Sequence, residues 1–279
     1  VPDCQDECPE DPLKSEPGRC GCGERDTDTD KDGSPDCEDG CPTDSFKIND
    51  IDPNIFWLEY KKRDEEQMHS FLWLSLIDRK TDHTKIKKII YIWMLKNSKY
   101  KKKTWETSTL STRIISWILN VDIILNNSTF EFRRNFLNCI ISQTNHLKRN
   151  IKFENDYSKR VEILTALLLT GLVFKEYEEN YDIAIKELEK LVKVFFDEDG
   201  FPISRNPNDL VFFSKYFILC QQCIKDAQKY LPEFLETIIK KNLICLKNIL
   251  TPNEQMPLFN GGVEEDLKRF YEHFEDLEI

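Results

Sequence analysis

Ile163-Leu164-Thr165-Ala166-Leu167-Leu168-Leu169-Thr170-Gly171-Leu172-Val173-Phe174 is the longest apolar run of this 279-residue sequence. Its apolar residues fall on nearly every side of a helix, a pattern typical of a helix enclosed by other elements. Because the run is too short to cross a bilayer, we expect no membrane span. The run therefore predicts the central helix of a large helical domain.

On both sides of this run, from Asp64 onward, apolar residues recur at every third and fourth position, which predicts amphipathic helices. No segment alternates as a strand would. The expected helices cover 64–78, 82–97, 108–126, 129–149, 156–177, 180–196, 208–229, 232–249 and 264–277. Short connections between long helices favour antiparallel hairpins, so we expect an all-α fold arranged as an arc or a toroid.

Helix-start signals support several of these ranges. Asp82 fits the first position of one helix, and Ser128 with Glu131 fits a capping box. Asn206 followed by Pro207 is a favoured pair of N-cap and first helical residue. These signals predict where three of the helices begin.

The N-terminal segment differs from the rest in charge. The whole chain has 39 basic and 50 acidic residues, a net charge of −11, and residues 1–45 hold 15 acids against 4 bases. The remainder is balanced. This distribution argues against nucleic-acid binding and favours cation binding at the N-terminus.

Cysteine is distributed in the same way. Six cysteines lie in the acidic segment, at positions 4, 8, 20, 22, 37 and 41, and four lie in helical sequence, at 139, 220, 223 and 245. The first six predict disulfides and an oxidising compartment, extracellular or periplasmic. The other four, including the pair Cys220-x-x-Cys223, fit buried thiols better than a redox or zinc site.

An internal repeat marks the acidic segment, because residues 2–11 recur in similar form at 35–44. This predicts further repeats upstream of Val1. Between the two copies, oxygen donors follow the spacing of an EF-hand-type loop, which suits Ca²⁺. The predicted calcium ligands are Asp28, Asp30, Asp32, Ser34, Asp36 and Asp39. With the cysteines, residues 1–45 resemble the thrombospondin type 3 calcium repeat.

The helical pattern stops once in the middle of the body. Asp197-Glu198-Asp199-Gly200-Phe201-Pro202-Ile203-Ser204-Arg205-Asn206-Pro207 contains a glycine, two prolines and several polar side chains. Loops of this kind on a rigid scaffold often carry binding residues. We therefore expect a functional loop between two long helices.

Several segments of the body, within about 68–262, resemble the helical domain of the heparinase II/III-like family. They are Phe71–Leu74, Arg113–Trp117, Phe136–Leu147, Leu167–Leu172, Asp199–Pro207 and Leu258–Gly261. The resemblance implies an incomplete (α/α) toroid, followed in the family by a β-sandwich that we expect to be absent from this chain. It also implies a polysaccharide lyase that cleaves uronic-acid glycans by β-elimination, with an acidic polysaccharide as partner.

In such a lyase, polar or cationic groups neutralise the uronate carboxylate while a base removes the neighbouring proton. By resemblance, the catalytic candidates are Asn145, His146 and Arg205, and the substrate-binding candidates are Arg113, Trp117 and Asn206. Two positions depart from the family. Pro202 replaces a histidine, and Asn208 lies near the position of the catalytic tyrosine, for which Tyr157 and Tyr216 are alternatives in sequence. The chain alone is therefore expected to show weak or no activity.

Simpler roles stay open for these candidates. Trp117 fits a core residue as well as a sugar platform, His146 fits a packed helix histidine, and Asn206 fits an N-cap. Lysines at 85, 87, 88, 99, 101, 102 and 103 fit either a solvated face or a surface that guides an anionic glycan.

Composition divides the chain into two expected domains. Residues 1–47 contain no isoleucine, whereas the sequence beyond is rich in it. We expect a calcium-binding repeat over 1–47 and a heparinase II/III-like helical domain over 48–279. The alternative function is a non-catalytic, extracellular adhesion or spacer module that binds glycan or protein.

Overall fold

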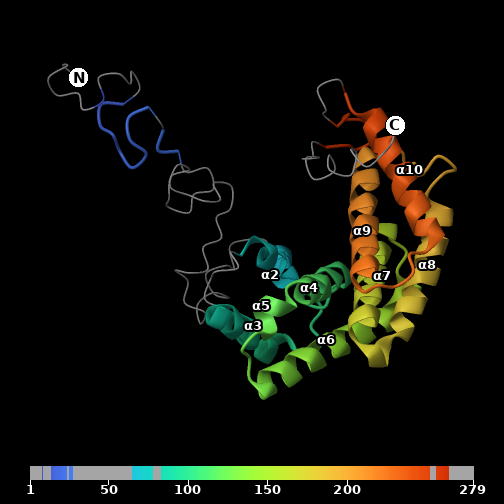
Figure 1. Cartoon of the computed structure of the whole chain (residues 1–279), viewed down its shortest axis with the longest axis horizontal. Helices are drawn as coiled ribbons and strands as arrows, with labels where there is room; N and C mark the ends of the chain where they lie inside the picture. The colour runs from blue at the N-terminus through green and yellow to red at the C-terminus, as the bar shows by residue number, and fades with distance from the viewer. Residues whose placement is uncertain are drawn as a thin grey trace.

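The structure, a computed structural model, describes residues 8, 14–23, 25–27, 65–77, 83–251 and 256–263 (Figure 1). Within these ranges every regular element is a helix, which confirms the all-α prediction. The elements are α2 (Glu65–Ser70), η3 (Leu72–Leu76), α3 (His83–Asn97), α4 (Thr107–Leu119), α5 (Val121–Leu125), α6 (Phe130–Asn150), η4 (Ile151–Phe153), α7 (Tyr157–Val173), η5 (Lys175–Tyr177), α8 (Glu179–Phe195), α9 (Pro207–Asp226) and α10 (Glu233–Ile249).

The central element is α7, as its apolar run predicts. All its side chains from Val161 to Gly171 are buried, and the helix contacts α4, α8 and α9. A Cβ added at Gly171 would lie 2.3 Å from the backbone nitrogen of Tyr181. Glycine is therefore required where α8 approaches α7 closely.

Side-chain contacts fix the direction of the helices around α7. Glu162 and Thr165 of α7 meet Tyr216 and Cys220 of α9 in the same order, so these two helices run parallel. In contrast, Tyr157 at the start of α7 packs against the end of α8, at Phe195, so α7 and α8 form an antiparallel hairpin.

One rim of the arc collects the starts of α4, α7 and α9 and the ends of α6 and α8. Glu106, the N-cap of α4, binds Lys159 in the first turn of α7 at 2.6 Å. Thr107 donates to Glu154, which lies in the link from α6 to α7. Inner helices that run parallel and alternate with outer antiparallel partners make an incomplete (α/α) toroid, as Figure 1 shows.

Two predicted helices are each divided. The expected helix over 64–78 breaks at Phe71, whose φ of 60° is left-handed, and the helix over 108–126 breaks at Asn120. The Asn120 side chain donates to the carbonyl of Ser116 and so competes with the helical backbone. Two further helices, expected to reach 177 and 229, end at Val173 and Asp226.

Of the two predicted helix starts that the described residues include, one is confirmed. The Asn206 side chain accepts a hydrogen bond from the backbone N–H of Asn208 at 3.0 Å, which confirms it as an N-cap. The predicted capping box at Ser128 is displaced by one residue from the actual N-cap. Thr129 is the N-cap, whereas the Ser128 hydroxyl donates to the carbonyl of Leu125. Asp82 and the helix over 264–277 lie outside the described residues.

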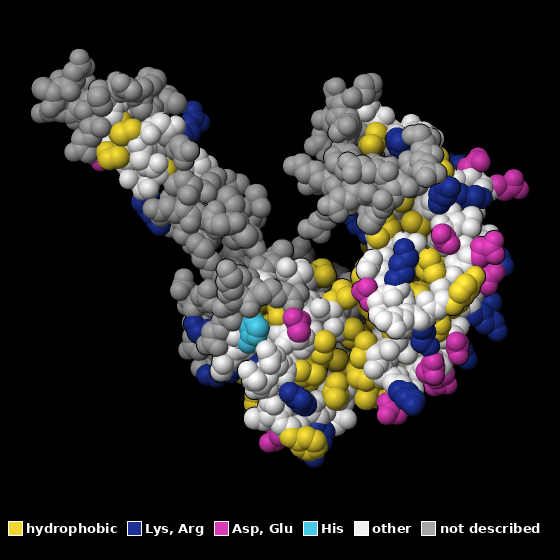
Figure 2. Space-filling model, viewed as in Figure 1, with side chains coloured by type: hydrophobic (Ala, Val, Ile, Leu, Met, Phe, Trp, Pro, Cys, Tyr) yellow, Lys and Arg dark blue, Asp and Glu magenta, His cyan; other side chains and the backbone are white. Residues whose placement is uncertain are grey.

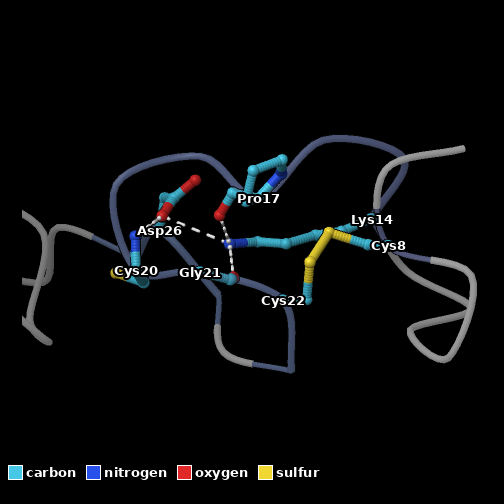
Figure 3. The surroundings of a disulfide bond; sticks show 7 residues. All are labelled: Cys8, Lys14, Pro17, Cys20, Gly21, Cys22 and Asp26. Atoms are coloured by element: carbon cyan, nitrogen blue, oxygen red, sulfur yellow. Dashed lines mark hydrogen bonds and ion pairs between the residues drawn. A yellow bond between two sulfur atoms is a disulfide. The ribbon is translucent and has the colours of Figure 1, made fainter.

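Around Cys8, the described part of the N-terminal segment holds a disulfide to Cys22 (Figure 3). The Lys14 ammonium donates to the carbonyls of Pro17 and Gly21 and pairs with Asp26 at 3.2 Å. Such contacts replace an apolar core in a short polar segment. With this one bond fixed, the fifteen possible pairings of six cysteines fall to three.

No helix among the described residues is both long and apolar enough to cross a membrane. The predicted calcium ligands, Asp28, Asp30, Asp32, Ser34, Asp36 and Asp39, lie outside the described residues. Calcium binding therefore stays a prediction.

Candidate functional site

The loop between α8 and α9 is organised by the carboxylate of Asp197. It accepts hydrogen bonds from the backbone N–H groups of Asp199 and Phe201, at 3.1 and 2.8 Å, and pairs with the Arg205 guanidinium at 2.6 Å. Burial acts to raise the pKa of Asp197, but the Phe201 N–H and Arg205 outweigh it and hold that pKa below its usual value. The carboxylate therefore holds the loop in one conformation.

Backbone bonds close the same loop. Asp197 N–H donates to the carbonyl of Phe201, and Ile203 N–H donates to the carbonyl of Phe195. Gly200 has a φ of +88°, and a Cβ there would lie 2.5 Å from the Cβ of Lys241 on α10. Glycine is thus required both by the backbone and by the neighbouring helix.

Arg205 occupies the exposed edge of this loop. Its φ is +56°, its side chain is 55% exposed, and its guanidinium lies 5.7 Å from the centre of the Phe201 ring. Asp197 pairs with Nη1 of the guanidinium, and about half of the side chain stays exposed. The group can therefore donate to a carboxylate or sulfate while keeping a fixed position.

A second segment, 256–263, meets this loop from the far end of the sequence. The Asn260 amide donates to the carbonyl of Arg205 at 3.2 Å, and Val263 N–H donates to the Asn208 side chain at 2.6 Å. A Cβ at Gly261 would lie 3.5 Å from the Asn206 amide nitrogen. The two sequence motifs that carry the family resemblance most specifically therefore form one surface.

Asn206 and Pro202 both have structural roles in this surface. Asn206 caps α9, as described above, and its amide nitrogen lies beside Gly261. Pro202 is buried and forms a bridge with Phe196, so its ring points away from solvent. Neither residue supplies a base.

His146, in contrast, lies at a different part of the rim. Its ring centroid is 5.5 Å from that of Tyr100 and 5.3 Å from that of Trp105, both in the link between α3 and α4. Burial and the positive charge of Arg149 lower the pKa of His146. Among the described ring contacts of His146, none joins it to the 197–207 loop. Asn145, beside it on α6, is half-buried.

Arg113 is fully buried, so it does not reach a substrate in this structure. Its guanidinium donates to the side chain of Gln143 and to the carbonyls of His69 and Thr104, at 2.8 to 2.9 Å. Burial lowers the pKa of Arg113 to about 9, which leaves it charged at neutral pH. The residue joins three parts of the helical body as an internal brace.

Trp117 is enclosed as well, which favours the core role over the sugar platform. It is 0% exposed and packs against Phe71, Trp93 and Phe136, with ring centroids 5.0 to 5.4 Å apart. Arg113 lies 4.4 Å from the Trp93 ring, so the aromatic cluster also surrounds the buried cation.

A buried acid that the sequence reasoning missed lies between α7 and α9. Glu162 is 6% exposed, and burial raises its pKa to about 7. It accepts a hydrogen bond from the hydroxyl of Tyr216 at 3.2 Å. A single acid at the start of an apolar helix reads as a surface residue, and only the approach of α9 reveals its burial.

The same contact decides the role of Tyr216. Burial and the carboxylate of Glu162 raise the pKa of Tyr216 far above its usual value, so it is a poor base. Tyr157 is half-buried and packs on Phe195. No described hydrogen bond joins either tyrosine to the 197–207 loop.

An apolar groove crosses the inner face of the arc between α4 and α9. It has a volume of about 700 Å³ and is lined by Leu72, Thr112, Ile115, Leu119, Phe212, Lys215, Tyr216, Ile218, Leu219 and Gln222. Figure 2 shows hydrophobic side chains gathered where these two parts of the molecule meet. Among the described residues, no group of three or more histidines, cysteines or acids is placed to hold a metal ion.

Comparison with solved structures supports the toroid. The chain is similar to a heparan sulfate lyase from Pedobacter heparinus, with 19% identity and a TM-score of 0.62 over 75% of this chain and 36% of that one. A second structure of the lyase is 18% identical, with a TM-score of 0.59 over 81% of this chain and 37% of that one. A structure of heparinase III is 16% identical, with a TM-score of 0.62 over 76% of this chain and 36% of that one. At these identities the likeness shows the fold.

This chain therefore spans little more than a third of the solved proteins that it matches. No protein of curated function matches it significantly by sequence. Residues 49–278, most of the chain, match the family described as Heparinase II/III N-terminus. That match includes α2 to α10 and both segments of the 197–207 and 256–263 surface, and it shows that this chain belongs to the heparinase II/III N-terminus family.

Proposed function

We propose that this chain recognises a uronic-acid-containing polysaccharide through the surface formed by residues 197–207 and 256–263, as the helical part of a polysaccharide-lyase-like protein. The observation that carries the proposal is the hydrogen bond from Asn260 to the carbonyl of Arg205, because it joins the two family motifs around a half-exposed guanidinium. The solved relatives named as heparan sulfate lyases support an acidic glycan as ligand.

The geometry suits the first requirement of β-elimination. A uronate carboxylate placed on Arg205 would have its charge neutralised, which acidifies the carbon-bound proton beside it. The second requirement is a base. The described residues of the two segments include no histidine or tyrosine, and the pKa of Tyr216 is raised rather than lowered. We therefore propose binding as the main activity, with weak or no cleavage by this chain alone.

Asn145 and His146 stay catalytic candidates by resemblance. Burial and the charge of Arg149 lower the pKa of His146, which favours its neutral form, the form that can accept a proton. If this pair acts on the substrate, Asn145→Ala and His146→Ala each abolish cleavage, whereas unchanged rates would remove both from the site.

An absorbance assay tests the lyase part of this proposal. Heparan sulfate, chondroitin sulfate, hyaluronan and alginate are each incubated with the chain while the ultraviolet band of unsaturated uronates is followed. Elimination gives a steady rise that Arg205→Ala reduces. A flat trace with all four polymers, together with retention of the protein on a glycan column, would favour a binding module.

A non-catalytic module is the second candidate, and the N-terminal disulfide favours it. The Cys8–Cys22 disulfide, together with the lysine-centred contacts around it, supports an oxidising compartment for this segment. We propose that residues 1–47 form a thrombospondin type 3-like repeat that binds Ca²⁺ through the six ligands predicted above. In this form the protein is an extracellular or periplasmic adhesion or spacer module with a glycan-binding helical body over 48–279.

A further inference from the structure

A groove lies between α3 and α6, and none of its lining residues belongs to the 197–207 loop. Its volume is about 330 Å³, at the small end of ligand sites. It is lined by Tyr91, Met94, Leu95, Ser98, Asn135, Asn138, Cys139 and Ser142. The apolar side chains and the Tyr91 ring lie beside serine hydroxyl and asparagine amide groups. This combination suits a sugar, because a sugar has apolar ring faces and hydroxyl groups at its edges.

A basic loop continues from one end of this groove. Ser98 ends the groove on the α3 side, and the next five residues are Lys99, Tyr100, Lys101, Lys102 and Lys103, all exposed. Among the described residues, Lys99, Lys101 and Lys102 have no ion-pair partner. These three lysines therefore present positive charge that no carboxylate of the described residues pairs with.

Aromatic rings connect the loop to the α6 side of the groove. Tyr100 is 62% exposed, and its ring lies against His146, one turn beyond Ser142. The His146 ring in turn packs edge-on against Trp105, whose indole N–H donates to the carbonyl of Asn97. Tyr100 is thereby held from behind while much of its surface stays in solvent. Arg149, also exposed, adds a further cation next to His146.

We propose that the α3–α6 groove and the adjoining 99–103 loop form a second contact site for an anionic polysaccharide, separate from the 197–207 surface. Sugar rings would lie in the groove and against Tyr100, and sulfate or carboxylate groups would meet the lysines. The site needs no catalysis and does not depend on Arg205. It would hold the polymer at a distance from the first surface and so extend the length of chain that the protein recognises.

Calorimetry with heparin tests this site on the full chain. The variant Lys99→Gln/Lys101→Gln/Lys102→Gln removes three charges from the loop. Its matched control, Lys186→Gln/Lys225→Gln/Lys240→Gln, removes three exposed charges from α8, α9 and α10. Each exposed ion pair contributes about twofold to fivefold in affinity, so the loop variant is expected to lose roughly tenfold or more and the control less than about twofold. Equal losses in both variants would overturn the proposal in favour of diffuse attraction.

Two further variants separate the aromatic contact from charge. Tyr100→Ala is expected to weaken heparin binding about threefold or more, whereas Tyr100→Phe keeps the ring and stays within about twofold of the wild type. Filling the groove with Ser142→Phe is expected to weaken binding as well. Full affinity in both Tyr100→Ala and Ser142→Phe would contradict a built site.

The same titrations distinguish the proposed second site from the proposed glycan surface at 197–207 and 256–263. Arg205→Ala should leave the effect of the loop variant unchanged, because the two sites lie on different elements. A loss in the loop variant with no effect of Arg205→Ala would support the second site and contradict the first. Single-stranded DNA of equal charge serves as a competitor of heparin. If the DNA displaces heparin equally well from the wild type and from the loop variant, recognition of sugar rings at the second site is excluded.

Discussion

At the scale of single residues, Gly200 and Gly261 offer a matched pair within the candidate surface. Both have a φ of +88°, but a Cβ at Gly200 would lie 2.5 Å from Lys241, whereas the nearest atom to a Cβ at Gly261 is 3.5 Å away. Strain from the backbone is common to both positions. A steric clash is added only at Gly200.

Alanine at these two positions should therefore differ in its effect. Gly200→Ala is expected to lower the free energy of unfolding by about 1–3 kcal/mol, and Gly261→Ala by about 1 kcal/mol. Urea denaturation measures both. An equal loss at the two sites would mean that α10 does not press on the loop as the structure shows.

Arg113 gives a second prediction at this scale, because its buried guanidinium satisfies three acceptors. Arg113→Met leaves these acceptors unpaired and should cost about 3 kcal/mol or more. The exposed Arg149 provides the control, and Arg149→Met should change the free energy of unfolding by less than about 0.5 kcal/mol. If Arg113→Met were as stable as the wild type but bound glycan poorly, Arg113 would be a ligand-binding residue after all.

At the scale of helices, the contact between α7 and α9 makes stability depend on pH through Glu162. Its pKa is raised from 4.5 to about 7 by burial. Between these two values the folded state binds more protons than the unfolded state, so stability falls as pH rises through this window. Below pH 4.5 both states carry the proton and the effect vanishes.

Glu162→Gln removes this dependence because the amide stays neutral. At pH 8 the variant is expected to be more stable than the wild type by roughly 2–3 kcal/mol, from the pKa shift of Glu162. At pH 4 the two should agree. Thermal unfolding between pH 4 and pH 8 provides the comparison, and a difference that stayed constant over this range would show that Glu162 does not titrate in the folded protein.

Helix positions were predictable from the sequence because the apolar period is strong, and α3, α6, α8 and α10 begin or end within a residue or two of the expected limits. The breaks were not. Phe71 adopts a left-handed backbone that an apolar residue does not signal, and the Ser128 capping box was wrong because Thr129 offers the same chemistry one position later.

The candidate site was predictable in part for a similar reason. The loop at 197–207 was visible as a polar break in the pattern, and Asn206 was correctly identified as a cap. Arg113 and Trp117 were harder to place, because periodicity shows that a face is apolar but not which polar residues share its burial. Asp197 as the centre of the loop becomes evident only from the hydrogen bonds that converge on it.

At the scale of the whole molecule, charge is distributed unevenly along the chain. The excess of acid lies in residues 1–45, and the helical body is balanced overall. Binding of a polyanion to the body therefore has to depend on local arrangements of cations instead of net charge.

The acidic segment should respond to Ca²⁺ instead. Calorimetry on the oxidised full chain is expected to show calcium binding that Asp28→Ala with Asp32→Ala weakens at least tenfold, because calcium sites lose affinity with each lost carboxylate. Reduction of the disulfides should weaken it too, since Cys8–Cys22 restricts the unfolded segment. Absence of calcium binding in the oxidised wild type would contradict the repeat.

The proposed glycan surface is tested most directly by heparan sulfate binding to wild type, Arg205→Lys and Arg205→Ala, measured by calorimetry in the same buffer. Arg205 is fixed by Asp197 and by the contact with Asn260, so its loss should remove one anchored charge-assisted contact. The proposed surface requires Arg205→Ala to weaken binding about tenfold or more, with the affinity of Arg205→Lys between those of Arg205→Ala and the wild type. Identical affinities for all three proteins would contradict it.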